Sequence, residues 1–427
     1  MDKIIIKGGN PLFGNVDING MKNAALPIIF ATILTKSKCV IENLPAVSDV
    51  TQSLTILQEM GATVRFLTPT TVEIDTKNFT QGIAPFDLVS KMRGSTYLLG
   101  AELGRFGKAN VNYPGGCDFG NRPIDQHIKG FEALGTKVWM ENGYINAIAD
   151  KGLIGNSVYF DVTSVGATVN VMLASVLAEG MTVIENAARE PHIVDLANFF
   201  NTCGANITGA GTSVIKVRGV KELHGCTYTI IPDMIEAGTF MVAAATVGGR
   251  VHVTNIIPKH METVSTKLIE MGAKIEEFDD AITVTSNGSL KSVNIKTLPY
   301  PGFPTDMHPQ FGAALCFAEG TGVITEGIWE SRFRYTEELR KMGANILVNG
   351  KTATYMGKHS MTGARVKAVD LRGGAAVMIA ALAAEGISEI TDIDVIRRGY
   401  YDIVGKFKEL GADIREELSS LSGTTVK

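Results

Sequence analysis

The chain has 427 residues, of which 45% are hydrophobic and 20% charged, and its formal net charge is −4. This length predicts two or three domains, and the composition is that of a globular protein. The negative net charge argues against a nucleic-acid partner, which needs a basic face that neutralises phosphates. No apolar stretch approaches the ~20 residues that span a bilayer, and the N-terminus lacks a signal-peptide pattern, so we expect no membrane partner.

One pattern recurs six times along the chain: a short helical stretch, a glycine, a small residue and then an apolar strand. The glycines are 68 to 74 residues apart, and each takes the place at a helix C-terminus that favours a positive φ. They are Gly61, Gly135, Gly204, Gly272, Gly343 and Gly411. Chance similarity between ordinary α/β domains is the alternative explanation, and the near-equal spacing argues against it.

A second helix precedes each copy, and because it is apolar on most faces we expect it to be buried. These helices are expected at residues 24–34, 95–103, 167–179, 237–247, 310–319 and 375–385. The repeats predict an α/β (α+β) fold, a two-domain inside-out α/β barrel with three βαβαββ-like units per domain, helices buried and sheets outside. We expect one domain at residues 21–231 and the other at residues 1–20 and 232–427.

Cationic side chains stand where several buried helices are expected to begin. Lys22 and Asn23 directly precede the first, and Arg93 and Arg372 precede two others. A helix N-terminus favours an anion, and arginine binds carboxylate or phosphate through two parallel hydrogen bonds. Each cation alone could be a solvated side chain or a surface ion pair, but their recurrence favours an anion-binding cleft. Further loop arginines are Arg122, Arg332, Arg334, Arg397 and Arg398.

Three glycines and two prolines mark residues 113–125 as a loop, with Cys117 near its tip. A neighbouring Arg122 can lower the pKa of this thiol from its usual ~8.5, which suits a nucleophile or a general acid. The competing interpretation is a small buried hydrophobic residue. That interpretation fits Cys39, Cys203, Cys226 and Cys316.

The spacing of the cysteines and histidines contains no Cys-x-x-Cys pair and no histidine pair on one helix face, so neither a disulfide framework nor a metal site is expected. Reduced thiols are typical of the cytoplasm, where we expect the protein. Two aspartates leave a choice open. Asp306 and Asp370 each precede an expected helix, so each is either an N-cap or a general base.

Together these motifs resemble the bacterial UDP-N-acetylglucosamine enolpyruvyl transferases over essentially the full chain. The most specific matches are Pro114-Gly115-Gly116-Cys117 with Arg122-Pro123, and Phe303-Pro304-Thr305-Asp306. The related enzyme that uses shikimate phosphate shares the fold but lacks the cysteine loop. Further matches are Gly20 with Lys22-Asn23, Met92-Arg93, Ser164-Val165-Gly166-Ala167-Thr168, Glu190-Pro191, Arg332-Phe333, Asp370-Leu371-Arg372 and Arg398-Gly399-Tyr400.

The resemblance implies a reaction in the cleft between the two domains. The enolpyruvyl group of phosphoenolpyruvate moves to the 3′-hydroxyl of UDP-N-acetylglucosamine and phosphate leaves, without metal or organic cofactor, as the committed step of peptidoglycan synthesis. It implies Cys117 as general acid, Asp306 as general base, and Lys22 and Arg398 as further catalytic residues. The implied substrate-binding residues are Lys22, Asn23, Arg93, Arg122, Pro123, Ile124, Asp125, Gln126, Val162, Thr163, Ser164, Val165, Asp306, Ile328, Arg332, Asp370, Arg372 and Arg398.

The chain departs from the family pattern at four positions. Val162 replaces a lysine of some members, Met234 the usual arginine, Tyr97 a frequent tryptophan, and Arg397 a frequent acidic residue. Loss of the first two cations leaves open a UDP-sugar-binding paralogue with weak activity and a regulatory role. A same-fold enolpyruvyl transferase with another acceptor is a second alternative. An RNA-end-processing enzyme built from similar repeats is disfavoured by the net charge.

Overall fold

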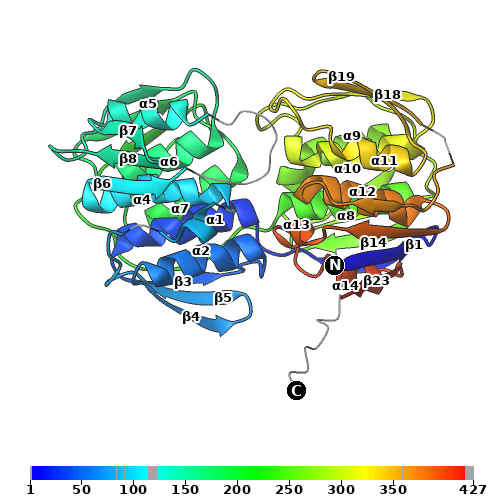
Figure 1. Ribbon diagram of the computed structural model, residues 1–427, viewed down its shortest axis with the longest axis horizontal. Helices are drawn as coiled ribbons and strands as arrows, with labels where there is room; N and C mark the ends of the chain where they lie inside the picture. The colour runs from blue at the N-terminus through cyan, green and yellow to red at the C-terminus, as the bar shows by residue number, and fades with distance from the viewer. Residues whose placement is uncertain (1, 83, 91, 114–122, 358–359, 419–427) are drawn as a thin grey trace. The chain divides into compact units, whose positions relative to one another are not determined.

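The structure is a computed structural model that describes residues 2–82, 84–90, 92–113, 123–357 and 360–418. The chain divides into two compact units, shown in Figure 1. Unit 1 comprises Met1–Ile18, Asp233–Leu298 and Gly302–Lys427. Unit 2 comprises Asn19–Pro232 and Pro299–Pro301. None of the described helices is long and apolar enough to cross a membrane.

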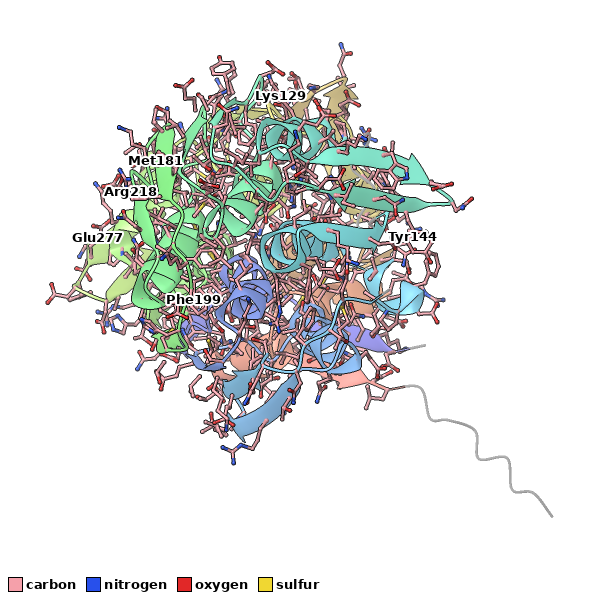
Figure 2. The ribbon with its side chains drawn as sticks, turned by 90° about the vertical axis from the view of Figure 1, so that its left-hand side faces the viewer. Lys129, Tyr144, Met181, Phe199, Arg218 and Glu277 are labelled. Carbon is pink, nitrogen blue, oxygen red and sulfur yellow. The ribbon has the colours of Figure 1, made fainter. Side chains whose placement is uncertain are left out.

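Unit 2 contains three small sheets. The strand order of the first sheet is β13 (Thr227–Thr229), β3 (Lys38–Glu42), β5 (Thr71–Asp75), β4 (Thr63–Thr68). The order of the second is β6 (Lys108–Asn112), β8 (Tyr144–Ile148), β7 (Lys137–Glu141). The order of the third is β11 (Asn206–Thr208), β12 (Val214–Arg218), β10 (Met181–Glu185), β9 (Ser157–Tyr159). Antiparallel pairing places Met181 of β10 opposite Arg218 of β12, and both are labelled in Figure 2. Strand β13, from the end of the third repeat, pairs in parallel with β3 of the first.

The interior of unit 2 is built from helices with small, apolar side chains. These are α1 (Lys22–Ala31), α4 (Tyr97–Phe106) and α6 (Val165–Ser175). A Cβ atom at Gly100 of α4 would lie 2.5 Å from the carbonyl oxygen of Asn170 in α6, so this close helix contact requires glycine. The remaining helical segments of the unit are η1 (Thr32–Thr35), α2 (Ser48–Glu59), α3 (Phe86–Val89), η2 (Arg93–Thr96), α5 (Asp125–Ala133) and α7 (Pro191–Thr202).

Unit 1 also contains three sheets. The strand order of the first sheet is β21 (Arg365–Lys367), β22 (Ile387–Thr391), β1 (Lys3–Lys7), β23 (Asp413–Glu417). The order of the second is β15 (Lys274–Glu277), β16 (Ala281–Ser286), β14 (Gly249–Thr254), β2 (Leu12–Asp17). The order of the third is β17 (Ile295–Lys296), β18 (Thr321–Thr325), β20 (Thr352–Met356), β19 (Asn345–Asn349). The two N-terminal strands are thus completed by strands from the C-terminal half of the chain.

Three helices that pack on one another fill unit 1, and nearly all their side chains are buried. They are α8 (Met234–Val247), α10 (His308–Phe317) and α12 (Leu371–Ala383). The other helical segments are η3 (Pro258–Met261), α9 (Glu262–Glu270), η4 (Thr305–Met307), α11 (Tyr335–Lys341), α13 (Asp394–Arg397) and α14 (Ile403–Glu409). The predicted two-domain α/β fold with buried helices is confirmed, although none of the six described sheets closes into a barrel.

The six repeat glycines adopt the backbone conformation that the sequence pattern predicts. Their φ angles lie between 88° and 102°, the left-handed region in which glycine avoids the steric cost of a Cβ atom. Each of these glycines lies between the end of a helix and the strand that follows it. Gly61, for example, separates α2 from β4, and Gly411 separates α14 from β23.

Candidate functional site

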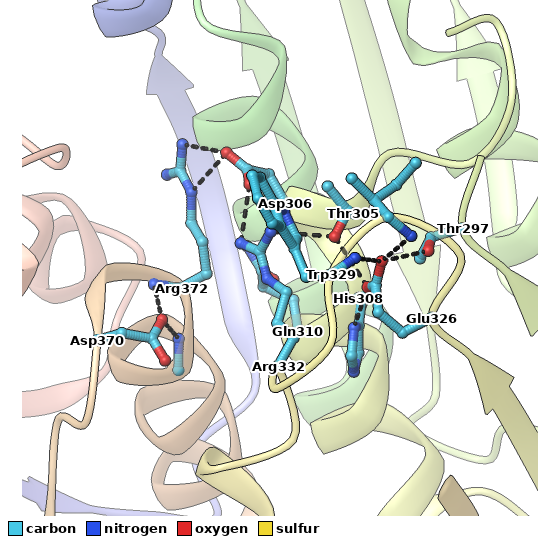
Figure 3. A network of polar contacts seen from close by, with 12 residues as sticks. Thr297, Thr305, Asp306, His308, Gln310, Glu326, Trp329, Arg332, Asp370 and Arg372 are labelled. Carbon is cyan, nitrogen blue, oxygen red and sulfur yellow. Dashed lines mark hydrogen bonds and ion pairs between the residues drawn. The ribbon is translucent and has the colours of Figure 1, made fainter. Parts of the chain in front are cut away.

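In unit 1, the loop before α10 presents Asp306 to two buried arginines. Arg332 Nη2 donates to Asp306 Oδ1 at 2.8 Å, and Arg372 Nη2 and Nε donate to Oδ2 at 3.1 and 3.2 Å (Figure 3). Both arginines are 3% exposed, whereas 27% of the Asp306 side chain is exposed. The two guanidinium groups stabilise the ionised carboxylate, the form that can accept a proton.

The N-cap interpretation holds for one of the two aspartates and fails for the other. Asp370 is the N-cap of α12, where its Oδ1 accepts from the backbone N–H groups of Arg372 and Gly373 at 3.0 and 2.9 Å. Asp306 lies inside η4, and neither η4 nor α10 has a side-chain cap, so the N-cap interpretation of Asp306 is wrong.

Arg372 lies in the first turn of α12, as its place in the sequence predicts. Burial disfavours its charged form, but Tyr400, Asp306 and Asp233 outweigh this effect and raise the pKa of Arg372 further above its usual value. Its guanidinium carbon also lies 5.3 Å from the centre of the Tyr400 ring. Arg372 Nη1 is buried and makes no hydrogen bond to the described residues, so a donor remains for an anionic ligand.

A buried carboxylate, Glu326, organises the loops beside Asp306, and sequence reasoning missed it. It is 1% exposed and accepts hydrogen bonds from five described donors. These are Thr297 Oγ1 (2.7 Å), Thr305 Oγ1 (2.8 Å), His308 Nδ1 (2.9 Å), Ile328 N (2.8 Å) and Trp329 N (3.1 Å). Thr305 precedes Asp306, the predicted base, and Ile328 is a predicted nucleotide contact. Glu326 therefore joins these two predicted parts of the site.

The pKa values of Glu326 and of its hydrogen-bond partner His308 both fall below their usual values. Burial raises the pKa of Glu326, but hydrogen bonds from His308, Thr297 and the backbone outweigh it and lower the pKa to about 2. Burial lowers the pKa of His308, so the imidazole is neutral at pH 7 and donates from Nδ1. The hydroxyl of Thr305 also accepts from Arg332 Nη1 at 3.0 Å, which extends the network to the arginine that holds Asp306.

In unit 2, Lys22 is the first residue of α1, as predicted, and its ammonium group is held by a carboxylate. Lys22 Nζ lies 3.0 Å from Asp49 Oδ2, and the two side chains are 11% and 3% exposed. Asp49 lies in the first turn of α2. The ion pair therefore fixes the direction of the Lys22 ammonium group. Asn23 follows in the same turn and is half-buried.

The predicted nucleotide residues of unit 2 come together around α5 and the start of α6. Gln126 Oε1 accepts from the backbone N–H of Asp161 at 3.0 Å, which places α5 beside the loop that leads to Val162. Ser164 is the N-cap of α6 and accepts from Ala167 N at 3.2 Å. Val162 is 61% exposed. Thr163 Oγ1 donates to Asn186 Oδ1 at 3.0 Å.

Beneath these residues lies His127, which sequence reasoning also missed. Burial lowers the pKa of His127 to about 4, and Arg93 adds to the effect. Its Nδ1 lies 2.9 Å from Asn170 Nδ2, and a Cβ atom at Gly166 would meet its ring at 2.9 Å. A neutral imidazole thus packs under the turn that begins α6. Arg93 itself opens η2, and burial lowers its pKa.

The remaining predicted residues are placed as follows. Cys117 and Arg122 lie outside the described residues. Pro123 is exposed, Ile124 is buried, and Asp125 begins α5, where its Oδ2 accepts from Gln126 Nε2 at 2.8 Å. Arg398 is the C-cap of α13 and is half-buried. Met234, the position where the family usually has arginine, is buried at the start of α8.

One group in the described part of the chain has the donor atoms for a metal ion, and it contains none of the predicted site residues. It consists of Cys39, Cys203 and Cys226. The spacing argument predicted no such site, since it considers cysteines that are neighbours in sequence.

Known proteins are similar to this chain over nearly its full length. The family model of EPSP synthase (3-phosphoshikimate 1-carboxyvinyltransferase) matches residues 6–407. The chain is 57% identical over 418 residues to UDP-N-acetylglucosamine 1-carboxyvinyltransferase 2 of Clostridium acetobutylicum, which covers 98% of this chain and 100% of that protein. It is 55% identical to UDP-N-acetylglucosamine 1-carboxyvinyltransferase of Clostridium botulinum, over 97% of this chain and 99% of that protein.

Solved structures share the fold at lower sequence identity. The enolpyruvyl transferase NikO from Streptomyces tendae matches with a TM-score of 0.88 and 24% identity, over 97% of this chain and 99% of that chain. EPSP synthase from Acinetobacter baumannii matches with a TM-score of 0.75 and 19% identity, over 98% and 100%. These similarities establish the architecture, and the curated relatives carry the argument about activity.

Proposed function

The chain belongs to the family of UDP-N-acetylglucosamine 1-carboxyvinyltransferases, and from this membership we propose the reaction that it catalyses. It transfers the enolpyruvyl group of phosphoenolpyruvate to the 3′-hydroxyl of UDP-N-acetylglucosamine and releases phosphate, a step of peptidoglycan synthesis. The observation that carries the proposal is the 57% identity along 98% of the chain. With its thiols reduced, the enzyme is proposed to act in the cytoplasm.

The chemistry needs an acid and a base, for which the proposal uses Cys117 and Asp306. The Cys117 thiol delivers a proton to the methylene carbon of phosphoenolpyruvate while the sugar oxygen bonds to the adjacent carbon. Asp306 takes the proton from the 3′-hydroxyl. The ionised carboxylate between Arg332 and Arg372 supports this role, since a base must be unprotonated at the start of the step. Loss of phosphate and of a proton from the methyl group then restores the double bond.

The anionic groups of phosphoenolpyruvate require cations, and the proposal takes them from the cationic residues predicted by the sequence. Lys22, already directed by Asp49, binds from unit 2. Arg332, Arg372 and Arg398 bind from unit 1, and Arg122 is their proposed partner outside the described residues. The unpaired Nη1 donor of Arg372 supports its role, because a carboxylate or phosphate oxygen would satisfy it. Asp370 contributes by capping the helix that carries Arg372.

The residues proposed to contact the sugar nucleotide are described for each unit by itself. In unit 2 the contacts are Asn23, Arg93, Pro123, Ile124, Asp125, Gln126, Val162, Thr163, Ser164 and Val165. The link from Gln126 to Asp161 supports them, because it brings the two segments together. In unit 1 the contact is Ile328, whose backbone N–H is held by Glu326.

Two alternatives make different predictions. An enzyme with shikimate phosphate as acceptor is disfavoured, since identity to a solved EPSP synthase is 19% and identity to a UDP-N-acetylglucosamine transferase is 57%. A weakly active, regulatory UDP-sugar-binding paralogue is motivated by Val162 and Met234, where family cations are replaced by apolar side chains. Nucleotide binding without turnover would support the paralogue.

The test measures phosphate release from phosphoenolpyruvate with each acceptor. We expect release with UDP-N-acetylglucosamine and none above background with shikimate 3-phosphate; the opposite result would overturn the proposal. A Cys117→Ser and Cys117→Asp pair then tests the acid. Both should lose alkylation by the epoxide fosfomycin. Full turnover by Cys117→Ser would refute the role, whereas activity retained by Cys117→Asp would indicate acid catalysis.

A further inference from the structure

Three cysteines that are far apart in sequence meet in unit 2. Cys39 lies on β3, Cys203 follows the last residue of α7, and Cys226 directly precedes β13. Their sulfur atoms all lie within 4.8 Å of one another, and those of Cys203 and Cys226 are 3.3 Å apart. The cluster takes no part in the proposed reaction, and its thiols are free in the structure.

Backbone pairing, rather than packing of the thiols alone, positions the cluster. The N–H of Val40 donates to the carbonyl of Cys226 at 2.8 Å, which sets Cys226 beside Cys39 as β13 pairs with β3. The N–H of His224 donates to the carbonyl of Cys203 at 2.9 Å, which ties the end of α7 to the same segment. The cluster is therefore held by the main chain of three segments.

Side-chain packing fixes α7 against β13 from the other direction. The ring of Phe199, on α7 and labelled in Figure 2, meets the ring of Tyr228 edge to face at 5.6 Å. Tyr228 is anchored by its hydroxyl, which donates to Asp195 Oδ1 at 2.6 Å. A preformed, rigid arrangement of donors is what a metal site requires.

The surroundings favour sulfur ligation over simple burial of three thiols. Cys39 and Cys203 are completely buried, whereas Cys226 is half-buried and gives access from solvent. The hydroxyl of Thr35 lies 3.6 Å from the Cys39 sulfur. Three sulfur atoms at this spacing can all contact one cation, which binds them as thiolates.

We propose that Cys39, Cys203 and Cys226 form a binding site for a soft, thiophilic cation, with Zn²⁺ as the reference ion. With Zn–S bonds of about 2.3 Å, the sulfur atoms of a tetrahedral site lie roughly 3.8 Å apart, so side-chain shifts of about 1 Å or less complete the site. Three thiolates bind the ion, and a solvent molecule on the Cys226 side takes the fourth position. Binding releases the thiol protons that remain.

The bound ion would join the first repeat of unit 2 to the third. Cys39 belongs to the first repeat, and Cys203 and Cys226 belong to the third, at the point where β13 crosses back to pair with β3. We therefore assign the site a structural role, in which the ion stabilises the folded unit because it binds the folded state and the unfolded chain lacks a preformed site.

The experiment uses the full chain carrying Cys117→Ser, so that the loop thiol does not bind metal, under a non-chelating reductant. The variants are Cys39→Ser and Cys226→Ser, and Cys316→Ser is the matched control, a buried thiol in unit 1 whose Sγ donates to Gly312 O at 3.2 Å. Cobalt is titrated first, because thiolate-to-Co²⁺ charge-transfer absorption reports sulfur ligation directly. Zinc is then added to displace it, and bound zinc is measured after dialysis.

The parent and Cys316→Ser should bind about one equivalent of zinc, show the charge-transfer band, and unfold at higher temperature with zinc than after chelation. Cys39→Ser and Cys226→Ser should lose the band and the zinc-dependent shift. Cys226→Ser is decisive, because its half-buried position tolerates serine; circular dichroism checks that it is folded. Equal zinc binding by the parent and Cys226→Ser would overturn the proposal. A Cys203–Cys226 disulfide that persists in protein purified under the reductant would overturn it too.

Discussion

Replacement of Glu326 by glutamine tests whether this carboxylate holds the loops around Asp306. Glutamine keeps the size but replaces one accepting oxygen by an NH₂ group. If the NH₂ group takes the Oε2 position, it faces the donors of Thr305 and His308. His308 can change tautomer, but the Thr305 hydroxyl, which also accepts from Arg332, loses the carboxylate oxygen to which it donates, so the network cannot be satisfied in full. We expect a folded but destabilised protein.

The size of the effect follows from the pKa of the Glu326 carboxyl group, which falls from its usual 4.5 to about 2 on folding. The difference corresponds to about 3 kcal/mol of unfolding free energy at pH 7. Because the folded pKa is depressed, this stabilisation is present above the unfolded pKa and is lost as the pH falls through the folded pKa; by pH 3 it drops to roughly half. The difference in unfolding free energy between the parent and Glu326→Gln should therefore become smaller as the pH falls from 7 to 3.

Urea unfolding monitored by circular dichroism at pH 7, 5, 4 and 3 measures this difference. Glu330→Gln is the control, since Glu330 is exposed in the same loop and its replacement should change stability by less than about 0.5 kcal/mol. The activity assay should show a lower kcat, because the altered contact is to Thr305, the neighbour of the proposed base Asp306. A Glu326→Gln protein as stable as the parent at pH 7, or a difference that is constant with pH, would refute the reasoning.

Three further substitutions test the proposed reaction by steady-state kinetics. Asp306→Asn should lower kcat by about 10²- to 10⁴-fold with little change in KM, because the base is lost; near-normal kcat would contradict its role. Arg372→Lys should raise the KM for phosphoenolpyruvate by roughly tenfold or more, since lysine cannot donate two parallel hydrogen bonds; an unchanged KM would contradict anion binding there. Val162→Lys should lower the KM for the sugar nucleotide, as its exposed side chain can supply the missing cation, and a higher KM would argue against the predicted pocket.

Local patterns in the sequence predicted much of this fold. A glycine after a helix requires a backbone conformation that neighbours in the chain determine, and so Gly61 and its five equivalents could be identified by spacing. The same holds for Lys22 and Arg372, whose places at helix starts follow from the apolar stretches behind them. Asp370 as an N-cap is equally local.

Contacts between distant segments explain what sequence reasoning missed. Glu326 follows β18 and resembles any surface carboxylate, and its role appears once Thr297, Thr305 and His308 have folded around it. His127 is buried because α6 packs on it, which its own neighbours in sequence do not predict. The cysteine cluster likewise depends on β13 pairing with β3, whereas motif spacing considers thiols that are close in sequence.

The position of β1 between β22 and β23 has a consequence for how the protein is synthesised. Ile5 pairs with Glu389 on one side and Arg415 on the other. At translation rates of about 5–20 residues per second, the first strand waits roughly 20–80 s for both neighbours. Unit 2 can fold by then, whereas β1 of unit 1 is still unpaired. The first strand of the chain is thus among the last to reach its final pairing, and during that interval it is exposed to chaperones and to other nascent chains.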